Sequence, residues 1–118
     1  MSYYTRLELS WDDGDYAAGD MTPEAVLLAA RPFVVASDWG VEDVLSDLRE
    51  SAEGNGLDRQ GYNRIVAFDL IELIATVSRA YPDVTFYARG VGEEYFDTWA
   101  RHFRGGAVLW EFGPFDPD

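Results

Sequence analysis

The chain contains no cysteine, no lysine and a single histidine, His102. Without cysteine it can form no disulfide bond, no thiolate metal site and no cysteine nucleophile. One histidine is too few for a typical zinc site, and neither a phosphate-binding glycine motif nor a serine nucleophile elbow occurs. We therefore expect no metal, no cofactor and no catalytic residues, and the absence of cysteine suits a reducing cytoplasm.

Long apolar runs are also absent. The longest, Val26 to Ala30, is far too short to cross a bilayer, and the first residues turn polar too soon for a signal peptide. A composition of 47% hydrophobic and 15% aromatic residues over 118 positions is typical of one globular domain. We expect residues 1–118 to form a single soluble α+β domain without a membrane partner.

Charge is what the chain has in excess. Twenty-two acidic residues face nine basic ones, for a formal net charge of −13. The imbalance is concentrated in residues 1–58, which hold thirteen of the acids and only three of the arginines. Such a charge repels nucleic acid and anionic membranes and attracts basic protein surfaces. We therefore expect no direct nucleic-acid binding, and a protein partner with a basic surface.

The first third of the chain predicts a strand and a helix. Residues 3–11 alternate between apolar and polar, which is typical of a half-buried strand. Thr22 can cap a helix whose first position is Pro23, and Pro32 should end or kink that helix. Residues 33–37 could be its last buried turn or a short strand.

A second helix is expected to begin at Ser37 or Asp38 and to stop at Gly54. A third covers residues 69–81 and could begin near residue 59. The alternative is that 64–68 form a strand, because short apolar runs do not distinguish the two.

Three further strands are expected at residues 84–91, 94–103 and 107–112, joined by short glycine-bearing turns as an antiparallel meander. Helices grouped before a meander indicate α+β architecture. The fold we predict is a four-stranded, mostly antiparallel sheet, made of the N-terminal strand and the C-terminal meander, with about three helices on one face. No internal repeat is evident.

The C-terminal half carries a resemblance. The stretch AYPDVTFYARGVGEEYFDTWARHFRGGAV resembles small uncharacterised acidic proteins of actinobacteria and their phages, and the opening SYYTRLEL is similar to their N-terminal strand. A looser likeness links the helix and meander to the ferredoxin-like domain of some phage proteins. The resemblance implies a phage-linked context, and hence a host-cell cytoplasm, but no activity or catalytic residue.

Acidic residues of the first half are the candidate protein-binding site. On the second helix, Asp43, Asp47 and Glu50 are spaced to lie in a row on the outer face, about 6 Å apart per four residues. That spacing is close to the distance between neighbouring phosphates, so the row could imitate a nucleic-acid backbone. Its like charges would go largely unrelieved, since Arg49 is the only base on this helix. The full set of candidates is Asp12, Asp13, Asp15, Asp20, Glu42, Asp43, Asp47, Glu50 and Glu53.

The acid-rich stretch GVGEEYFDTW, residues 90–99, raises the alternative of a small enzyme using Glu93, Glu94, Asp97 and His102. For hydrolysis or metal chemistry these side chains would have to converge on one pocket. We favour a charged hairpin turn instead, in which Asp97 pairs across strands with a partner such as Arg89.

Aromatic residues suggest a third possibility. Four Trp, seven Tyr and seven Phe are more than a core of this size requires, and exposed aromatics favour interfaces. Trp110, Phe112 and Phe115 are candidates for a partner surface, a homodimer or self-assembly. The leading hypothesis is nevertheless a non-enzymatic acidic module that binds, and in its sharper form inhibits, a host protein through its anionic face by nucleic-acid mimicry.

Overall fold

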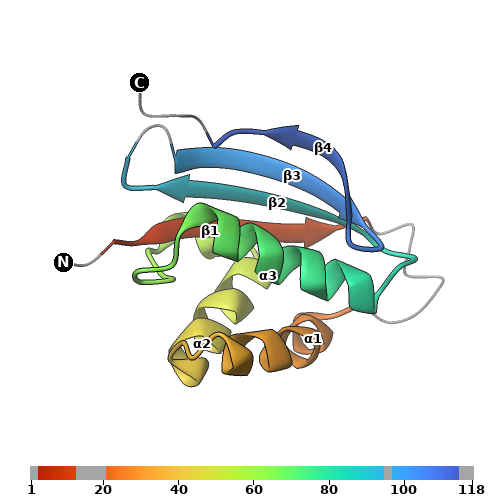
Figure 1. The fold of residues 1–118 in the computed structure, drawn as a ribbon, viewed down its shortest axis with the longest axis horizontal. Helices are drawn as coiled ribbons and strands as arrows, with labels where there is room; N and C mark the ends of the chain where they lie inside the picture. Colours follow the sequence, from red (N-terminus) through yellow and green to blue (C-terminus); the bar gives the residue numbers. More distant parts are fainter. Residues whose placement is uncertain (1–2, 13–20, 95–96, 115–118) are drawn as a thin grey trace.

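The structure, a computed structural model, describes residues 3–12, 21–94 and 97–114. Four strands form one sheet above three α-helices (Figure 1). In chain order the elements are β1 (Thr5–Trp11), α1 (Pro23–Ala36), α2 (Val41–Ala52), the short 3-10 helix η2 (Gly56–Asp58), α3 (Ala67–Ala80), β2 (Thr85–Gly92), β3 (Thr98–Arg104) and β4 (Ala107–Phe112).

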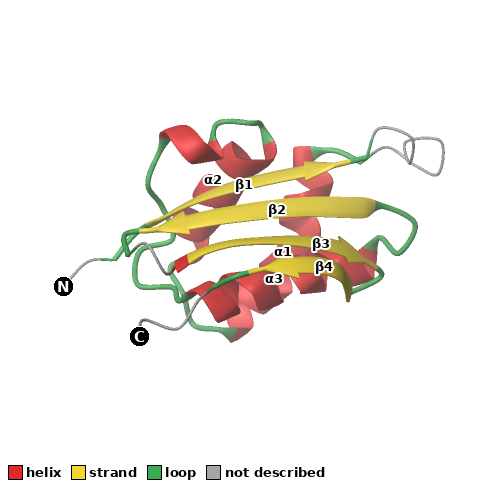
Figure 2. Ribbon diagram, turned by 90° about the horizontal axis from the view of Figure 1, so that it is seen from above, coloured by secondary structure: helices red, strands yellow, loops and turns green. Residues whose placement is uncertain are grey.

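The sheet has the strand order β1-β2-β3-β4, and every neighbouring pair is antiparallel. The N-terminal strand joins the meander by pairing with β2, in a register that places Thr5 opposite Gly92 and Trp11 opposite Phe86. All three helices lie behind one face of the sheet, and the other face is free of helices (Figure 2). The predicted α+β architecture is confirmed. The order of strand, three helices and three strands differs from the β-α-β-β-α-β order of ferredoxin-like domains.

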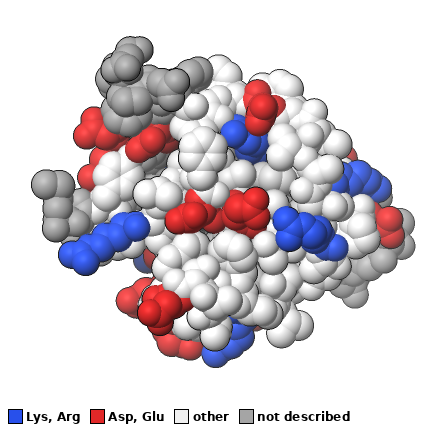
Figure 3. All heavy atoms as spheres, viewed as in Figure 1, with Lys and Arg blue, Asp and Glu red and all other residues white. Residues whose placement is uncertain are grey.

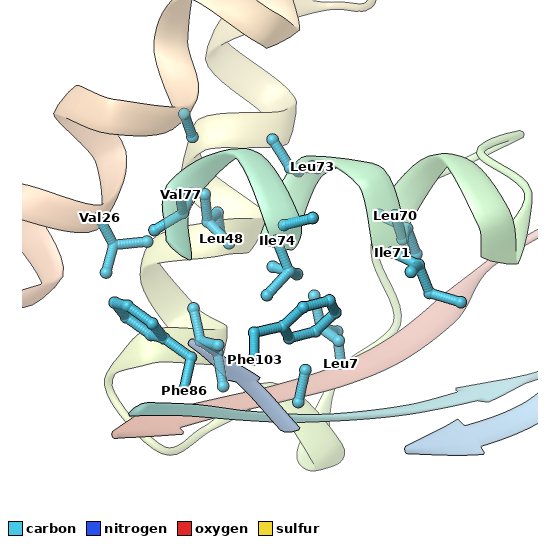
Figure 4. Packing of buried hydrophobic residues seen from close by; sticks show 14 of the residues in the cluster. Leu7, Val26, Leu48, Leu70, Ile71, Leu73, Ile74, Val77, Phe86 and Phe103 are labelled. Atoms are coloured by element: carbon cyan, nitrogen blue, oxygen red, sulfur yellow. The ribbon is translucent and has the colours of Figure 1, made fainter. Parts of the chain in front are cut away.

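The core lies between the sheet and α3, with α1 and α2 completing it on the far side (Figures 1 and 4). β1, β2 and β3 alternate, and in each of them the residues that face the helices are buried, as Leu7, Phe86 and Phe103 show. β4 is exposed along its whole length. α3 supplies the opposing side chains, among them Leu70 and Ile74. Burying each such side chain stabilises the fold by roughly 1.5–3 kcal/mol.

Helix α1 begins as the sequence predicts, because the Thr22 hydroxyl accepts a hydrogen bond from the Ala25 N–H at 3.1 Å and Pro23 occupies the first turn. Pro32 does not end the helix. Pro32 and Leu28, the residue whose carbonyl loses its helical partner, both lie on the exposed side, where water can satisfy that carbonyl. Residues 33–37 therefore complete a last helical turn, and no strand forms there.

Helix α2 begins later than predicted. Its N-cap is Gly40, not Ser37 or Asp38, because Asp38 adopts a positive φ of 58°. The intervening turn packs the Trp39 ring edge-on against Phe33, with centroids 5.7 Å apart. The expected stop at Gly54 is confirmed by its φ of 94°.

Residues 59–66 form neither a helix nor a strand, so both expectations for this segment are wrong. Tyr62 and Arg64 have positive φ values of 55° and 66°, which a helix cannot accommodate. Gly61 makes an isolated bridge with Thr5, with reciprocal N–H to carbonyl bonds of 2.8 and 3.0 Å. The segment is thus pinned to the start of β1, and α3 begins only at residue 67.

Within the described residues, no helix combines the length and apolar character needed to cross a membrane.

Replacing Gly90 by alanine should destabilise the fold by about 1–3 kcal/mol. A Cβ at position 90 would lie 2.4 Å from the indole of Trp99, which is buried against the helices. Urea unfolding followed by circular dichroism would measure the loss. Gly40→Ala is the control, because its Cβ would meet nothing closer than 3.6 Å, and its cost should stay within about 1 kcal/mol. Equal costs for the two variants would contradict this packing.

Candidate functional site

Asp47 is drawn into the fold and does not lie in an exposed acidic row. Its side chain is only 16% exposed. Its Oδ2 accepts a hydrogen bond of 2.9 Å from the Tyr62 N–H, and its Oδ1 lies 3.5 Å from Arg59 Nη2. The predicted row of Asp43, Asp47 and Glu50 on the outer face of α2 is therefore wrong at its centre. Asp47 links α2 to residues 59–66 through Tyr62 and Arg59, which is a structural role.

The protonation of Asp47 reflects that position. Burial raises the pKa of its carboxyl above the ordinary value, while the Tyr62 N–H and the Arg59 guanidinium act in the opposite direction. Burial also raises the pKa of the Tyr62 hydroxyl, which lies 2.8 Å from Ser51 Oγ. The interior end of α2 is thus a small polar network closed by Asp47.

The other acids on α2 are more exposed, but arginines lie beside several of them. Glu42 lies 3.8 Å from Arg31, and Glu50 lies 3.7 Å from Arg59. The expectation of unrelieved like charges on this helix is therefore wrong, because the tertiary fold brings arginines from α1 and from residue 59. Figure 3 shows acidic and basic side chains interspersed over the face it views.

The remaining predicted acids separate into two groups. Asp12, Asp43 and Glu53 are exposed, and Asp12 follows the last residue of β1, where its N–H bonds to the Thr85 carbonyl at 3.1 Å. The loop acids Asp13, Asp15 and Asp20 lie outside the described residues.

The hairpin carboxylates do not meet His102. Glu93 and Glu94 are exposed in the turn. Asp97 accepts a hydrogen bond from the Tyr3 hydroxyl, whose pKa burial and this bond raise to about 12. His102 lies far along the sheet, in the row that begins at Ser10 of β1, roughly 20 Å from Tyr3 at the rise of a strand. The proposed four-residue catalytic group is not assembled.

The predicted pairing of Asp97 with Arg89 is also wrong. Arg89 instead bonds to Glu8 of the neighbouring strand at 2.9 Å. Among the described residues, no cluster of three or more His, Asp or Glu side chains could hold a metal ion.

The helix-free face of the sheet carries a row of rings that crosses three strands. Tyr87 of β2 is in register with His102 of β3, and His102 with Trp110 of β4. Their ring centroids are 4.7 and 4.9 Å apart, and Phe112 stacks beyond Trp110 at 6.5 Å with an interplanar angle of 9°. We call Tyr87, His102, Trp110 and Phe112 the aromatic face.

Much of this face is open to solvent. Trp110 and Phe112 are 49% and 50% exposed, and the neighbouring Leu109 is 59% exposed. β4 lies at the sheet edge and pairs only with β3 among the strands the structure describes. A contiguous apolar area of this kind is typical of a protein interaction site.

A buried arginine holds β4 in place. Arg101 is 6% exposed on the helix side of β3, and its guanidinium donates to the carbonyls of Phe112 and Gly113. Its Nε also lies 3.4 Å from Glu111. Because these bonds fix the end of β4, they orient the rings on the opposite face.

Sequence reasoning identified part of the aromatic face. Trp110 and Phe112 were candidates, whereas Tyr87 and His102 were missed as members of the same surface, and Phe115 lies outside the described residues. The signal available in the sequence was the alternation within β2 and β3, which places both side chains opposite the buried Phe86 and Phe103. What was lacking was the register between the strands.

Comparison of the chain with protein-family models, with curated proteins and with solved structures finds no significant match.

Removing the Asp47 carboxyl should destabilise the protein by about 1–3 kcal/mol in the Asp47→Ala variant, because the Tyr62 N–H then loses its acceptor. Asp47→Asn keeps an acceptor oxygen and should cost less. Thermal and urea unfolding would measure both, and an alanine variant as stable as the asparagine variant would contradict this role.

The same residue predicts a pH dependence. Because burial raises the pKa of Asp47, the folded protein binds this proton more tightly than the unfolded chain does. The wild type should gain stability relative to Asp47→Asn as the pH falls through the raised pKa toward the ordinary value of 3.8, and should lose that gain as the pH rises again. A difference in free energy of unfolding that stays constant across this range would contradict the prediction.

Proposed function

We propose that this protein is a non-enzymatic interaction module that binds a basic protein partner through the aromatic face. The observation that carries the proposal is the exposure of Trp110 and Phe112 at the edge of a helix-free sheet face. Exposed aromatic residues are enriched among those that dominate binding energy at interfaces, because they bury a large area with few rotatable bonds.

Two features favour a basic partner over a neutral one. Aromatic rings attract the ammonium and guanidinium groups of lysine and arginine by cation–π interaction, which contributes about 0.5–2 kcal/mol per contact. The net charge of −13 attracts a basic protein over longer distances and raises its association rate. The two effects act on the same class of partner.

Three arginines lie on the helix-free face by strand parity, Arg6 of β1, Arg89 of β2 and Arg104 of β3, and none of them is on β4 beside Trp110 and Phe112. The Arg6 guanidinium donates to the Leu57 carbonyl at 3.0 Å. Arg89 is neutralised by Glu8 at 2.9 Å. Arg104 donates to the Thr85 hydroxyl at 2.8 Å, at the end of β3 away from Phe112.

This proposal keeps the basic protein partner that the sequence predicts. It places the contact on the aromatic face and not on the acidic residues of α2. Nucleic-acid mimicry required an exposed row centred on Asp47, which is instead bonded to Tyr62. Exposed acids such as Asp43 and Glu53 remain available to attract the partner at a distance. Inhibition of a host protein depends on the phage resemblance alone and stays a prediction.

A peptide-display selection would test the proposal. Wild-type protein is the bait, and the Trp110→Ala/Phe112→Ala variant removes peptides that bind elsewhere. We expect the enriched peptides to be rich in lysine and arginine, to bind the double variant at least tenfold more weakly, and to lose affinity as salt is raised from 50 to 500 mM. Amide shifts in NMR spectra should change around Tyr87 and His102.

The matched control is Val35→Ala, which removes an exposed apolar side chain of α1 (56% exposed) on the helical side of the molecule, and which should leave peptide affinity unchanged. Enrichment of neutral or acidic peptides, or equal binding to the double variant, would contradict the proposal.

A further inference from the structure

Helices α1 and α2 enclose an open groove of about 390 Å³, and both helices lie on the helical side of the sheet (Figure 1). The two helices contribute the same pattern to it. α1 places Glu24, Leu27, Leu28 and Arg31 along the groove, and α2 repeats the spacing eighteen residues later with Glu42, Leu45, Ser46 and Arg49. The residues around this short repeat do not repeat, so it is not evident from the sequence alone.

The two copies of the pattern run in opposite directions. Glu24 at the start of α1 pairs with Arg49 near the end of α2, and Arg31 pairs with Glu42 at 3.8 Å. Each end of the groove therefore carries one acid and one base, and the four charges alternate in sign around its rim. The lining is related to itself by an approximate twofold rotation.

The outer side of α1 is unusually apolar for a helix in water. Leu28 and Val35 are 74% and 56% exposed, and Pro32 beside them is exposed as well. The opposite side of the helix is buried through Val26 and its neighbours in the core. A helix that is apolar on both sides is typically covered on both sides.

We propose that this surface is the interface of a homodimer, in which α1 of each copy lies on α2 of the other and the four helices form a bundle. A twofold interface must be complementary to itself. In this arrangement Glu24 faces the second copy's Arg49, and Arg31 faces the second copy's Glu42, so every rim charge meets its opposite. The projecting Leu28 faces the small Ser46.

A second copy fits better than the other candidate occupants. An anionic membrane carries no bases that could pair with Glu24 and Glu42, whereas a second copy offers each rim charge its opposite. The alternative twofold arrangement, α1 on α1, also matches charges, but it sets the projecting Leu28 of the two copies against each other. The complementarity of charge and of size together select the α1-on-α2 arrangement.

Charge-swap variants test both the dimer and its arrangement. Wild-type protein should show the mass of two chains in sedimentation equilibrium at 0.1 mM and 150 mM salt. Arg31→Glu and Glu42→Arg should each be monomeric. In a dimer of either variant, residue 31 of each copy would face a residue 42 of the same charge in the other copy, which gives two repulsive pairs. An equimolar mixture of the two should dimerise, because one corner then holds the swapped pair of charges and the other keeps the native pair of Arg31 and Glu42. In the α1-on-α1 arrangement Arg31 would face the second copy's Glu24 and Glu42 would face its Arg49, so both variants would again be monomeric but mixing them would rescue nothing.

Leu28→Asp should also be monomeric, and its circular dichroism spectrum should match the wild type because Leu28 is exposed. Trp110→Ala should remain dimeric, so the dimer and the proposed function can fail separately. A monomeric wild type, single variants that dimerise as the wild type does, or a mixture that stays monomeric would overturn the proposal.

Discussion

Burial of one face of the sheet against α3 is the constraint from which the other features follow. Once Leu7, Phe86 and Phe103 point toward the helices, the alternation of each strand sends the intervening side chains to the opposite face. The antiparallel register then aligns those side chains into a row across the strands. The aromatic face is in this sense a consequence of the core: Tyr87 and His102 point away from the helices because their strand neighbours are buried, and the pairing of β4 with β3 places Trp110 beside His102.

Pairing of charges limits what the acidic composition can do. The excess of acid in the first half is real, but folding brings Arg31, Arg49 and Arg59 beside glutamates and Asp47. Asp47, at the centre of the expected acidic row, is partly buried and accepts a hydrogen bond from the Tyr62 N–H. It therefore holds the segment that contains Tyr62 and is not part of an exposed row. What remains is a long-range negative potential, and the described acids of α2 do not form the expected continuous row. Such a potential accelerates association with basic proteins without defining where they dock.

The two proposed surfaces lie on opposite sides of the molecule, with the aromatic face on the sheet and the groove between the outer helices (Figures 1 and 2). A dimer joined through α1 and α2 would therefore present its two aromatic faces outward. A partner with two basic segments could engage both, and the second contact would then form at a high effective concentration. The same arrangement would cover the exposed leucine and valine of α1, which otherwise remain apolar surface in water.

Local patterns were sufficient for the elements whose signals act over a few residues. The alternation in β1 and β2, the cap at Thr22 and the stop at Gly54 are of this kind, and each is present where the sequence places it. Local patterns failed where a distant contact decided the outcome. Residues 59–66 bind the start of β1 instead of extending α3, and α1 continues through Pro32 because water can satisfy the freed carbonyl.

The sequence by itself determined the class of fold, the strand parity and the overall charge, because periodicity and composition need no knowledge of the partner segments. Only the tertiary structure decided which rings share a surface, which acids are neutralised and which helix faces enclose the groove. The physical reason is that these features depend on pairs of residues far apart in the chain, as with Glu24 and Arg49 or His102 and Trp110. Their juxtaposition is set by register and packing, which no single segment encodes.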